Sequence, residues 1–194
     1  MYLRDTLRLP AKGLSPSALR PFHQPVRAGS DTVTPSALEA VARTLLAAYP
    51  VRVMRWRKSL SGVAWHVEKE GVFVETRIEA PRPRTPLSFS IFAHEIGHHL
   101  QHMERASWPS RMEQEHDAWE RAFALMREHG VPITEKVEKR FHDSMRYALA
   151  KALRRGARRV PQPFEHFLDD PYIQRVRERA ERRRAGRRRR AWWA

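Results

Sequence analysis

The amino-acid sequence predicts an α+β fold, in which a small three-stranded sheet packs with several helices and a basic tail follows. Apolar residues recur every three or four positions in separate segments, which is the period of an amphipathic helix. Between the first two of these segments, side chains instead alternate with a period of two, which is typical of a strand. The clearest case is the run that places Val72, Val74, Thr76 and Ile78 on one face. A chain of 194 residues is long enough to bury one core of this kind.

The chain divides into three parts by composition. Residues 1–33 are rich in proline, arginine and serine without any period, and we interpret them as an irregular arm. Residues 34–160 carry the periodic segments and are expected to form the folded domain. Residues 161–194 begin with two closely spaced prolines and become polar and arginine-rich, so we interpret them as a linker followed by an exposed helix or a disordered tail.

Within the domain, turn and capping residues predict where each element begins and ends. Thr34 followed by proline predicts a helix start, and Pro50 predicts its end. Strands are expected at 51–56, 62–67 and 71–78, with Glu70 and Gly71 forming the turn before the third. Three further helices are expected at 87–103, at 110–130 after the S-x-x-E capping signature, and from 134 onward.

Composition also excludes several kinds of site. The chain has no cysteine, so it can contain neither a disulfide, nor a thiol nucleophile, nor a cysteine-based zinc site. The N-terminus has no apolar run of signal-peptide length, and the longest apolar stretch, 41–53, is interrupted by Arg43, Pro50 and Arg52. We therefore expect a cytoplasmic protein that does not use a membrane as a partner.

The segment 94–98 reads His-Glu-Ile-Gly-His and lies in the middle of the helix expected at 87–103. Two histidines four residues apart lie on one face of a helix, one turn apart, so both imidazoles can bind one tetrahedral Zn²⁺. Glu95 lies beside this pair, where it can act as the general base toward a water activated there. This is the H-E-x-x-H spacing of zinc peptidases. The alternative is that the histidine face is merely solvated.

The same helix has a separate apolar stripe that falls almost opposite the two histidines: Phe89, Phe92, Ile96, Leu100 and Met103. His94 and His98 are therefore not expected to be core residues of this helix. His99 and His102 point in other directions, and we expect both on the helix surface.

A third zinc ligand is expected from the helix at 110–130. Glu115 falls between apolar residues of that helix, whereas Glu113, Asp117 and Glu120 fall on its solvated side. A carboxylate on an apolar face needs a partner, and either a zinc ion or an arginine would supply one. His116 lies in the same sector and is the rival ligand or a supporting residue.

These residues resemble the ImmA/IrrE family of gluzincin-type zinc metallopeptidases. The matching features are Ala93 through His98, Glu115 followed by Ala118, and Ala122-Phe123. The resemblance implies a zincin-like domain, Zn²⁺ bound by His94, His98 and Glu115, Glu95 as the base, and a protein substrate, often a regulatory protein such as a repressor. The chain departs from the family at Trp119, where the family usually has asparagine, and no helix-turn-helix accompanies the peptidase.

Two further features concern the substrate. The strand expected at 71–78 precedes the histidine helix, and it could hold an extended peptide along its edge or be purely structural. Hydrolysis also needs a donor near the developing oxyanion. The candidates for that donor are His142, Tyr147, His66 and His166, with His116 as a supporting residue.

The last part of the chain concentrates positive charge. Residues 173–194 contain ten arginines and two glutamates, or +8 of the chain's +15. This segment is either a solvated terminus or a nucleic-acid contact with salt-sensitive affinity. The candidate contact residues are Arg182, Arg183, Arg184, Arg187, Arg188, Arg189 and Arg190.

Taken together, these patterns predict a zinc-dependent metallopeptidase acting on a protein substrate. The alternative is a basic nucleic-acid-binding protein whose zinc site is structural or vestigial, and a third candidate is a zinc hydrolase acting on another kind of bond. Glu95 favours catalysis, because a structural zinc site has no need of a base.

Overall fold

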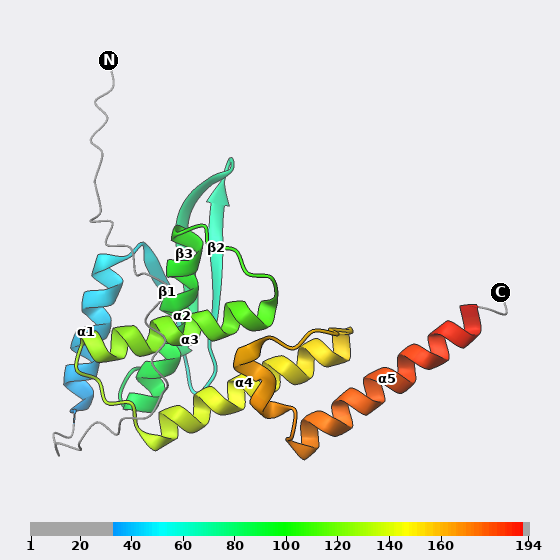
Figure 1. Ribbon diagram of the computed structural model, residues 1–194. Helices are drawn as coiled ribbons and strands as arrows, with labels where there is room; N and C mark the ends of the chain where they lie inside the picture. The colour runs from blue at the N-terminus through cyan, green and yellow to red at the C-terminus, as the bar shows by residue number, and fades with distance from the viewer. Residues whose placement is uncertain (1–32, 192–194) are drawn as a thin grey trace. The chain divides into compact units, whose positions relative to one another are not determined.

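The computed structural model describes residues 33–191 of the chain, with side chains described through Gly186 (Figure 1). Nearly all of the arm expected at 1–33 therefore lies outside the described residues. The elements follow one another as α1 (Pro35–Ala48), β1 (Val51–Arg57), β2 (Val63–Lys69), β3 (Val72–Pro81), α2 (Pro86–Met103), α3 (Arg111–Glu128), α4 (Glu135–Arg155), the short 3₁₀ helix η1 (Gln162–Phe167) and α5 (Pro171–Ala191). The predicted α+β class and the three-stranded sheet are confirmed.

Local signals set the helix starts and the hairpin turn. The side chain of Thr34 accepts a hydrogen bond from the Ala37 amide at the start of α1, and Ser110 does the same for the Glu113 amide at the start of α3. The expected turn between β2 and β3 is present, and both of its central residues, Glu70 and Gly71, have positive φ. That backbone form matches the twist of a tight hairpin, which explains the glycine.

The sheet has the strand order β1-β3-β2, so β3 is its central strand. β1 pairs with β3 in parallel, and β2 pairs with β3 antiparallel. β3 is paired on both sides from Thr76 onward, whereas Val72 to Glu75 pair with β2 alone among the described strands. The edge expected at 71–78 is therefore open only over its first half. The outer strands of the sheet are β1 and β2.

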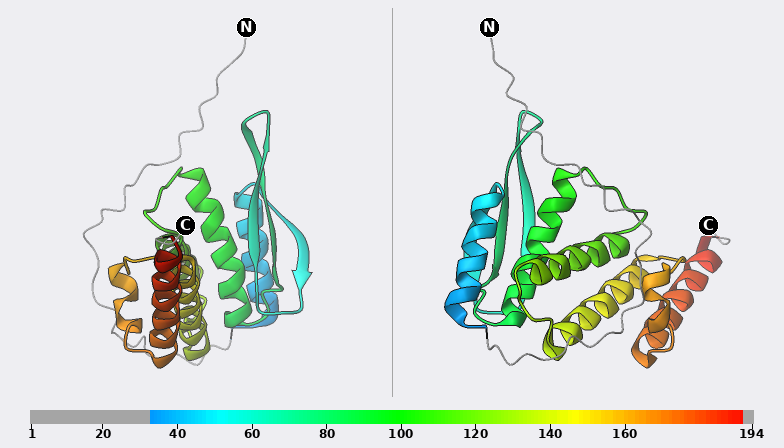
Figure 2. Two further views of the ribbon diagram at one scale, coloured as in Figure 1. Left: turned by 90° about the vertical axis from the view of Figure 1, so that its right-hand side faces the viewer. Right: turned by 60° about the vertical axis from the view of Figure 1, so that its left-hand side comes forward.

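Helix α2 contacts both the sheet and the helices α3 and α4, and Figure 2 shows it between them. Its apolar residues Phe89, Phe92 and Ile96 are fully buried. His99 is also fully buried, where a surface position was expected, and its Nδ1 lies 2.8 Å from the Thr76 hydroxyl of β3. The prediction failed because a polar residue gave no periodic signal that this side of α2 faces the sheet.

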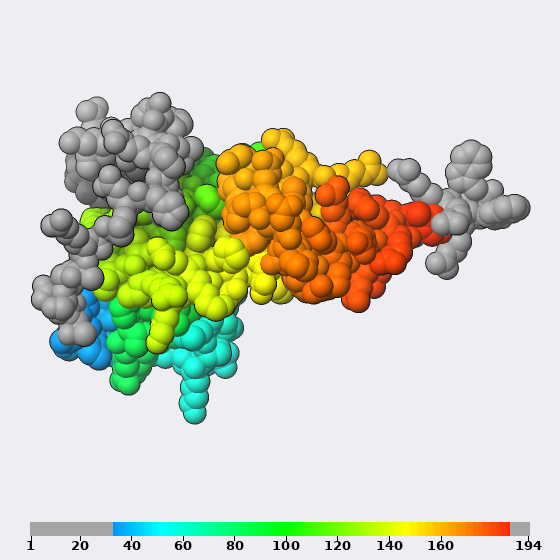
Figure 3. All heavy atoms as spheres, turned by 60° about the horizontal axis from the view of Figure 1, so that its bottom comes forward, coloured from blue at the N-terminus to red at the C-terminus, as the bar shows by residue number. Residues whose placement is uncertain are grey.

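The C-terminal segment packs on α4 rather than leaving the domain at residue 161. Phe164 and Phe167 of η1 and Ile173 and Val176 of α5 are buried in the same core as the rest of the domain. Figure 3 shows η1 and α5 against α4. The boundary expected at 161 is therefore wrong, because four apolar residues scattered among polar ones suffice to hold this segment.

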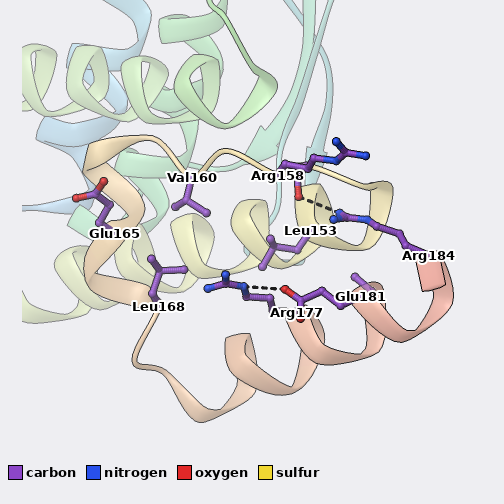
Figure 4. A pocket seen from close by; sticks show the side chains of 10 residues that line it. Leu153, Arg158, Val160, Glu165, Leu168, Arg177, Glu181 and Arg184 are labelled. Atoms are coloured by element: carbon purple, nitrogen blue, oxygen red, sulfur yellow. Dashed lines mark hydrogen bonds and ion pairs between the residues drawn. The ribbon is translucent and has the colours of Figure 1, made fainter.

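A hollow of about 410 Å³ lies between α4, η1 and α5 (Figure 4). Beside it, Arg184 of α5 donates to the carbonyl oxygen of Ala157 at 3.0 Å and so links α5 to the segment after α4. Arg177 and Glu181 form an ion pair within α5. None of the described helices is both long and apolar enough to cross a membrane.

Candidate metal and catalytic site

Three potential metal ligands from two helices converge on one point. His94 and His98 lie one turn apart on α2, and Glu115 lies on α3. The Oε2 atom of Glu115 is 3.4 Å from Nε2 of His94 and 3.6 Å from Nε2 of His98. All three donor atoms lie within 4.8 Å of one another. The structure thus brings together the three residues that the sequence analysis named as ligands.

These separations can be compared with those around a zinc ion. Donors about 2.0–2.1 Å from a tetrahedral zinc lie roughly 3.3 Å from each other. The two distances from Glu115 to the histidines are close to this value, so the residues fit a metal ion without large movement. Two imidazoles and one carboxylate also leave one tetrahedral position open, as hydrolytic zinc sites do.

A glycine allows the two helices to approach closely enough. A methyl group at Gly97 would lie 2.5 Å from the carbonyl oxygen and 3.2 Å from Cα of Ala118 on α3. Because both neighbouring atoms belong to the backbone, neither could yield easily. Gly97 therefore sets the α2–α3 spacing that places Glu115 against the histidine pair.

Behind the site, hydrogen bonds orient one of the two histidines. Nδ1 of His98 lies 2.9 Å from Oε1 of Gln101, and Nε2 of Gln101 donates to Oδ2 of Asp117 at 2.8 Å and to the carbonyl oxygen of Gln114. With Nδ1 held as the donor, Nε2 of His98 carries the lone pair that a metal needs. Asp117 is half-buried, and its carboxylate also accepts a hydrogen bond from Arg121.

The other histidine is held differently. The ring of His94 packs against Trp119, with centroids 4.7 Å apart, and its buried Nδ1 has no hydrogen-bond partner among the described residues. On its Nδ1 side, packing rather than a hydrogen bond therefore fixes this ring. Trp119 itself is 2 % exposed, so the residue at which the chain departs from the resembled family forms a wall of the site.

Glu115 uses its two oxygens in two directions. One oxygen faces the histidines, and the other accepts a hydrogen bond from Nε of Arg111 at 2.9 Å. Of the two partners considered for this carboxylate in the sequence, a zinc ion and an arginine, the arginine is present, and the histidines that could hold a metal lie on its other side. Burial would raise the pKa of Glu115, but the hydrogen bonds from His94 and His98 outweigh it and hold that pKa well below its usual range.

The histidine pKa values differ because the two rings differ in burial and contacts. Burial lowers the pKa of His94 to about 4, so that ring is neutral and able to bind a metal at neutral pH. Burial also disfavours charge on His98, but the hydrogen bond and negative charge of Glu115 outweigh it and raise the His98 pKa above its usual value. A proton therefore binds more readily to His98 than to His94.

Glu95 lies beside the three ligands and is only 4 % exposed. Burial raises its pKa to about 7, where a carboxylate can both take up and release a proton at neutral pH. Its carboxyl group rests on the backbone of Gly62 at the start of β2, where a Cβ atom would lie 2.7 Å from the carboxyl carbon. Gly62 therefore provides the space that Glu95 occupies.

A cleft of about 590 Å³ opens next to these residues. Its walls come from α2, α3 and α4, and they include His94, Glu95 and Glu115. A smaller cleft of about 280 Å³ adjoins the same residues from the side of β2, where Val63, Ala64 and His66 line it. The site is therefore reachable from two sides.

The candidate oxyanion donors do not all reach this site. Tyr147 lines the larger cleft with His94 and Glu95, and His66 lines the smaller one. His142 and His166 instead contact Phe167, on the side where η1 packs. Neither of these two histidines lines either cleft, so the structure does not support them as donors.

His116, the rival ligand, does not join the converging donors. Its ring packs near Phe141 and Phe164, with centroids 5.9 and 6.2 Å apart, and its Nε2 lies 4.0 Å from Glu120. Its ring therefore faces α4 and η1 and is not one of the three converging donors.

Arg140 is a site residue that the sequence analysis missed. It lines the larger cleft from α4, and its positive charge adds to the burial that lowers the His94 pKa. Its buried Nε has no hydrogen-bond partner among the described residues. No periodicity could identify it, because its role depends on how α4 packs across α2.

The tail arginines lie apart from this site. Arg182 and Arg183 are exposed on α5, whereas Arg184 is half-buried against Ala157. The side chains of Arg187, Arg188, Arg189 and Arg190 lie outside the described residues. Comparison of the chain with family models, with curated proteins and with solved structures found no match.

Proposed function

We propose that this chain is a zinc-dependent metallopeptidase that hydrolyses peptide bonds of a protein substrate. The observation that carries the proposal is the convergence of His94, His98 and Glu115 with Glu95 beside them, at the wall of an open cleft. Two imidazole nitrogens and one carboxylate oxygen, without any thiolate, suit Zn²⁺ in a hydrolytic site. A structural zinc site would have a fourth protein ligand and no need of Glu95.

In this proposal the metal ion and the residues around it have separate roles in hydrolysis. Bound zinc would supply a Lewis acid that activates water and polarises the substrate carbonyl. Glu95, whose pKa burial raises to about 7, would accept a proton from the attacking water and pass it to the leaving amine. Gln101 would keep the His98 ring in the tautomer that leaves Nε2 free.

The edge of β2 is the best place for an extended substrate. β2 pairs with β3 on one side only, and its residues Val63, Ala64 and His66 line the smaller cleft together with Glu95. A peptide added along this edge would run past Glu95 and gain main-chain hydrogen bonds. This proposes for β2 the role that the sequence analysis considered for the next strand.

Nucleic-acid binding is a second candidate function, and the exposed arginines of α5 favour it. The buried side of α5 is formed by Ile173 and Val176, and Arg175, Arg179 and Arg182 remain on its exposed surface. A helix with one packed face and one arginine-rich face can contact phosphates without disturbing the domain. This function could coexist with hydrolysis.

Glu95→Gln tests the proposed hydrolysis. The amide keeps the size of the carboxyl group but cannot act as a base, so we expect cleavage to fall by roughly 10²–10⁴-fold or more while zinc content stays at the wild-type level. Zinc-loaded protein would be incubated with a mixture of proteome-derived peptides, and new termini counted by mass spectrometry. Glu120→Gln, an acid on α3 outside the site, is the matched control. Cleavage by Glu95→Gln at the wild-type rate would refute the assigned base.

A further inference from the structure

One face of α4 forms a wall of the larger cleft and is unusually basic. Arg140, Tyr147, Lys151 and Arg155 recur at intervals of seven, four and four residues, and all four line the cleft that also contains Glu95. Residues spaced in this way lie along one side of a helix. The cleft thus has its catalytic residues on α2 and α3 and a row of cations opposite them on α4.

These cations are not neutralised by neighbouring acids. Within the described part of the chain, no ion pair is formed by Arg140, Lys151 or Arg155. Lys151 contacts the ring of Tyr147, with Nζ 6.0 Å from the centroid. The one acid that α4 contributes to the cleft, Asp143, already pairs with Lys139 at 2.6 Å and with Arg146 at 3.8 Å.

The rest of the cleft is largely apolar. Ile91, Met112, Trp119, Ala148 and Ala152 contribute to its walls. A buried arginine nitrogen beside such walls is costly unless a ligand accepts from it, and Nε of Arg140 has no acceptor among the described residues. A carboxylate is the group in a peptide that pairs most strongly with a guanidinium in this setting.

We infer that this face of α4 is a subsite for acidic side chains of the substrate, so that the enzyme selects peptides with aspartate or glutamate near the cleaved bond. Arg140, the one of these three cations whose charge acts on His94, would bind the acid closest to the scissile bond, and Lys151 and Arg155 would bind acids further along the chain. The inference rests on the proposed hydrolysis for its biological meaning, but binding can be measured without any cleavage.

The test uses the zinc-loaded, full-length Glu95→Gln protein, which binds substrate without cutting it. A random-sequence peptide mixture with both termini blocked would be passed over the immobilised protein, and retained peptides sequenced by mass spectrometry. We expect aspartate and glutamate to be enriched. A retained peptide should then bind about fivefold to tenfold more tightly than its version with asparagine or glutamine at the same positions. Arg140→Gln and Lys151→Gln, combined, should remove that difference.

Matched substitutions separate this subsite from general attraction to a basic protein. Lys136→Gln combined with Arg159→Gln removes the same charge from two exposed positions that line neither cleft, and it should leave the acid preference intact. If the preference disappears only when Arg182 and Arg183 are replaced, the tail attracts the peptides and the subsite is wrong. The subsite is also wrong if acids are favoured only when the peptide has a free C-terminal carboxylate.

The subsite and the proposed hydrolysis can fail separately. Wild-type protein that cleaves peptides with no preference for acids would overturn the subsite and leave the hydrolysis standing. Selective retention of acidic peptides that is abolished by replacing Arg140 and Lys151 would support the subsite, whether or not the wild type cleaves them.

Discussion

At the level of single residues, the proposed metal site depends on side chains that never touch the metal. The ring of His98 is oriented by Gln101, which is itself held by Asp117 and by the backbone of α3. His94 lacks such a partner and relies on packing against Trp119. The two histidines therefore differ in how they would respond to substitution of their neighbours.

Gln101→Ala should weaken zinc binding without unfolding the protein. The substitution frees Nδ1 of His98, so that ring can turn or adopt the other tautomer, and outer hydrogen bonds of this kind contribute roughly 10–100-fold to metal affinity. Competition with a fluorescent zinc chelator measures the change. Gln174→Ala, at an exposed position of α5, is the control. An unchanged zinc affinity would show that packing alone holds His98.

The residues of the site differ in how well the sequence could predict them. His94, Glu95 and His98 follow from spacing within one helix, and Glu115 follows from an acid on an apolar face of the next. Gln101 and Arg140 could not be predicted, because each acts across a contact between two helices. Periodicity describes one element at a time and contains no information on which faces meet.

At the level of elements, a buried polar contact links the sheet to α2. The hydroxyl of Thr76 on β3 lies 2.9 Å from Nδ1 of His66 on β2 and 2.8 Å from Nδ1 of His99 on α2. The ring of His66 also stacks on His102, with centroids 3.9 Å apart. These contacts join β2 and β3 to α2, the helix that carries His94 and His98, and so fix the position of α2 on the sheet.

Acid should loosen this contact in a defined pH range. Burial lowers the pKa of His66 to about 4, below its value of about 6.5 in an unfolded chain. Between these two pKa values the unfolded state binds more protons than the folded state. The contribution of His66 to the free energy of unfolding is therefore at its maximum above about pH 6.5 and decreases as the pH drops toward about 4. Urea denaturation of chelator-treated protein at several pH values should show a smaller acid loss for His66→Gln than for wild type.

Gln174→Ala supplies the control for that measurement, because it replaces an exposed residue that does not titrate and should leave the pH dependence unchanged. A His66→Gln protein with the same acid loss as wild type would mean that His66 does not contribute.

The elements themselves were predictable where their signals are local. Capping by Thr34 and Ser110 and the turn at Glu70-Gly71 gave correct helix starts and a correct hairpin. The strand order could not be predicted, because the parallel pairing of β1 with β3 joins strands that are not consecutive. The sequence therefore could not show that β2 is an outer strand beside the site.

At the level of the whole molecule, positive charge accumulates after the core ends. Residues through Val176 contribute to the core, and beyond them α5 is dominated by exposed arginines. The sequence analysis placed the end of the domain too early, because Phe164, Phe167 and Ile173 are separated by polar residues. A deletion that begins at residue 173 would remove core side chains along with the charge.

A truncation after Gly186 should separate these two effects. It removes Arg187, Arg188, Arg189 and Arg190 and leaves Ile173 and Val176 in place. If the tail binds nucleic acid, the slope of log affinity against log salt should fall by roughly 0.9 for each phosphate of duplex DNA that the shortened tail no longer neutralises. Fluorescence anisotropy with a DNA duplex over a salt titration measures this. Equal affinities of full-length and truncated protein at every salt concentration would exclude binding by the tail.

The central claim is that His94, His98 and Glu115 together hold one zinc ion, and calorimetric titration of chelator-treated protein with zinc tests it most directly. We expect about one zinc per chain for wild type and for Glu120→Ala, an acid on the same helix outside the site. Glu115→Ala should bind zinc more than roughly 100-fold more weakly, since loss of an outer partner alone costs 10–100-fold. Wild-type affinity in Glu115→Ala, or no zinc binding by the wild type, would contradict the claim.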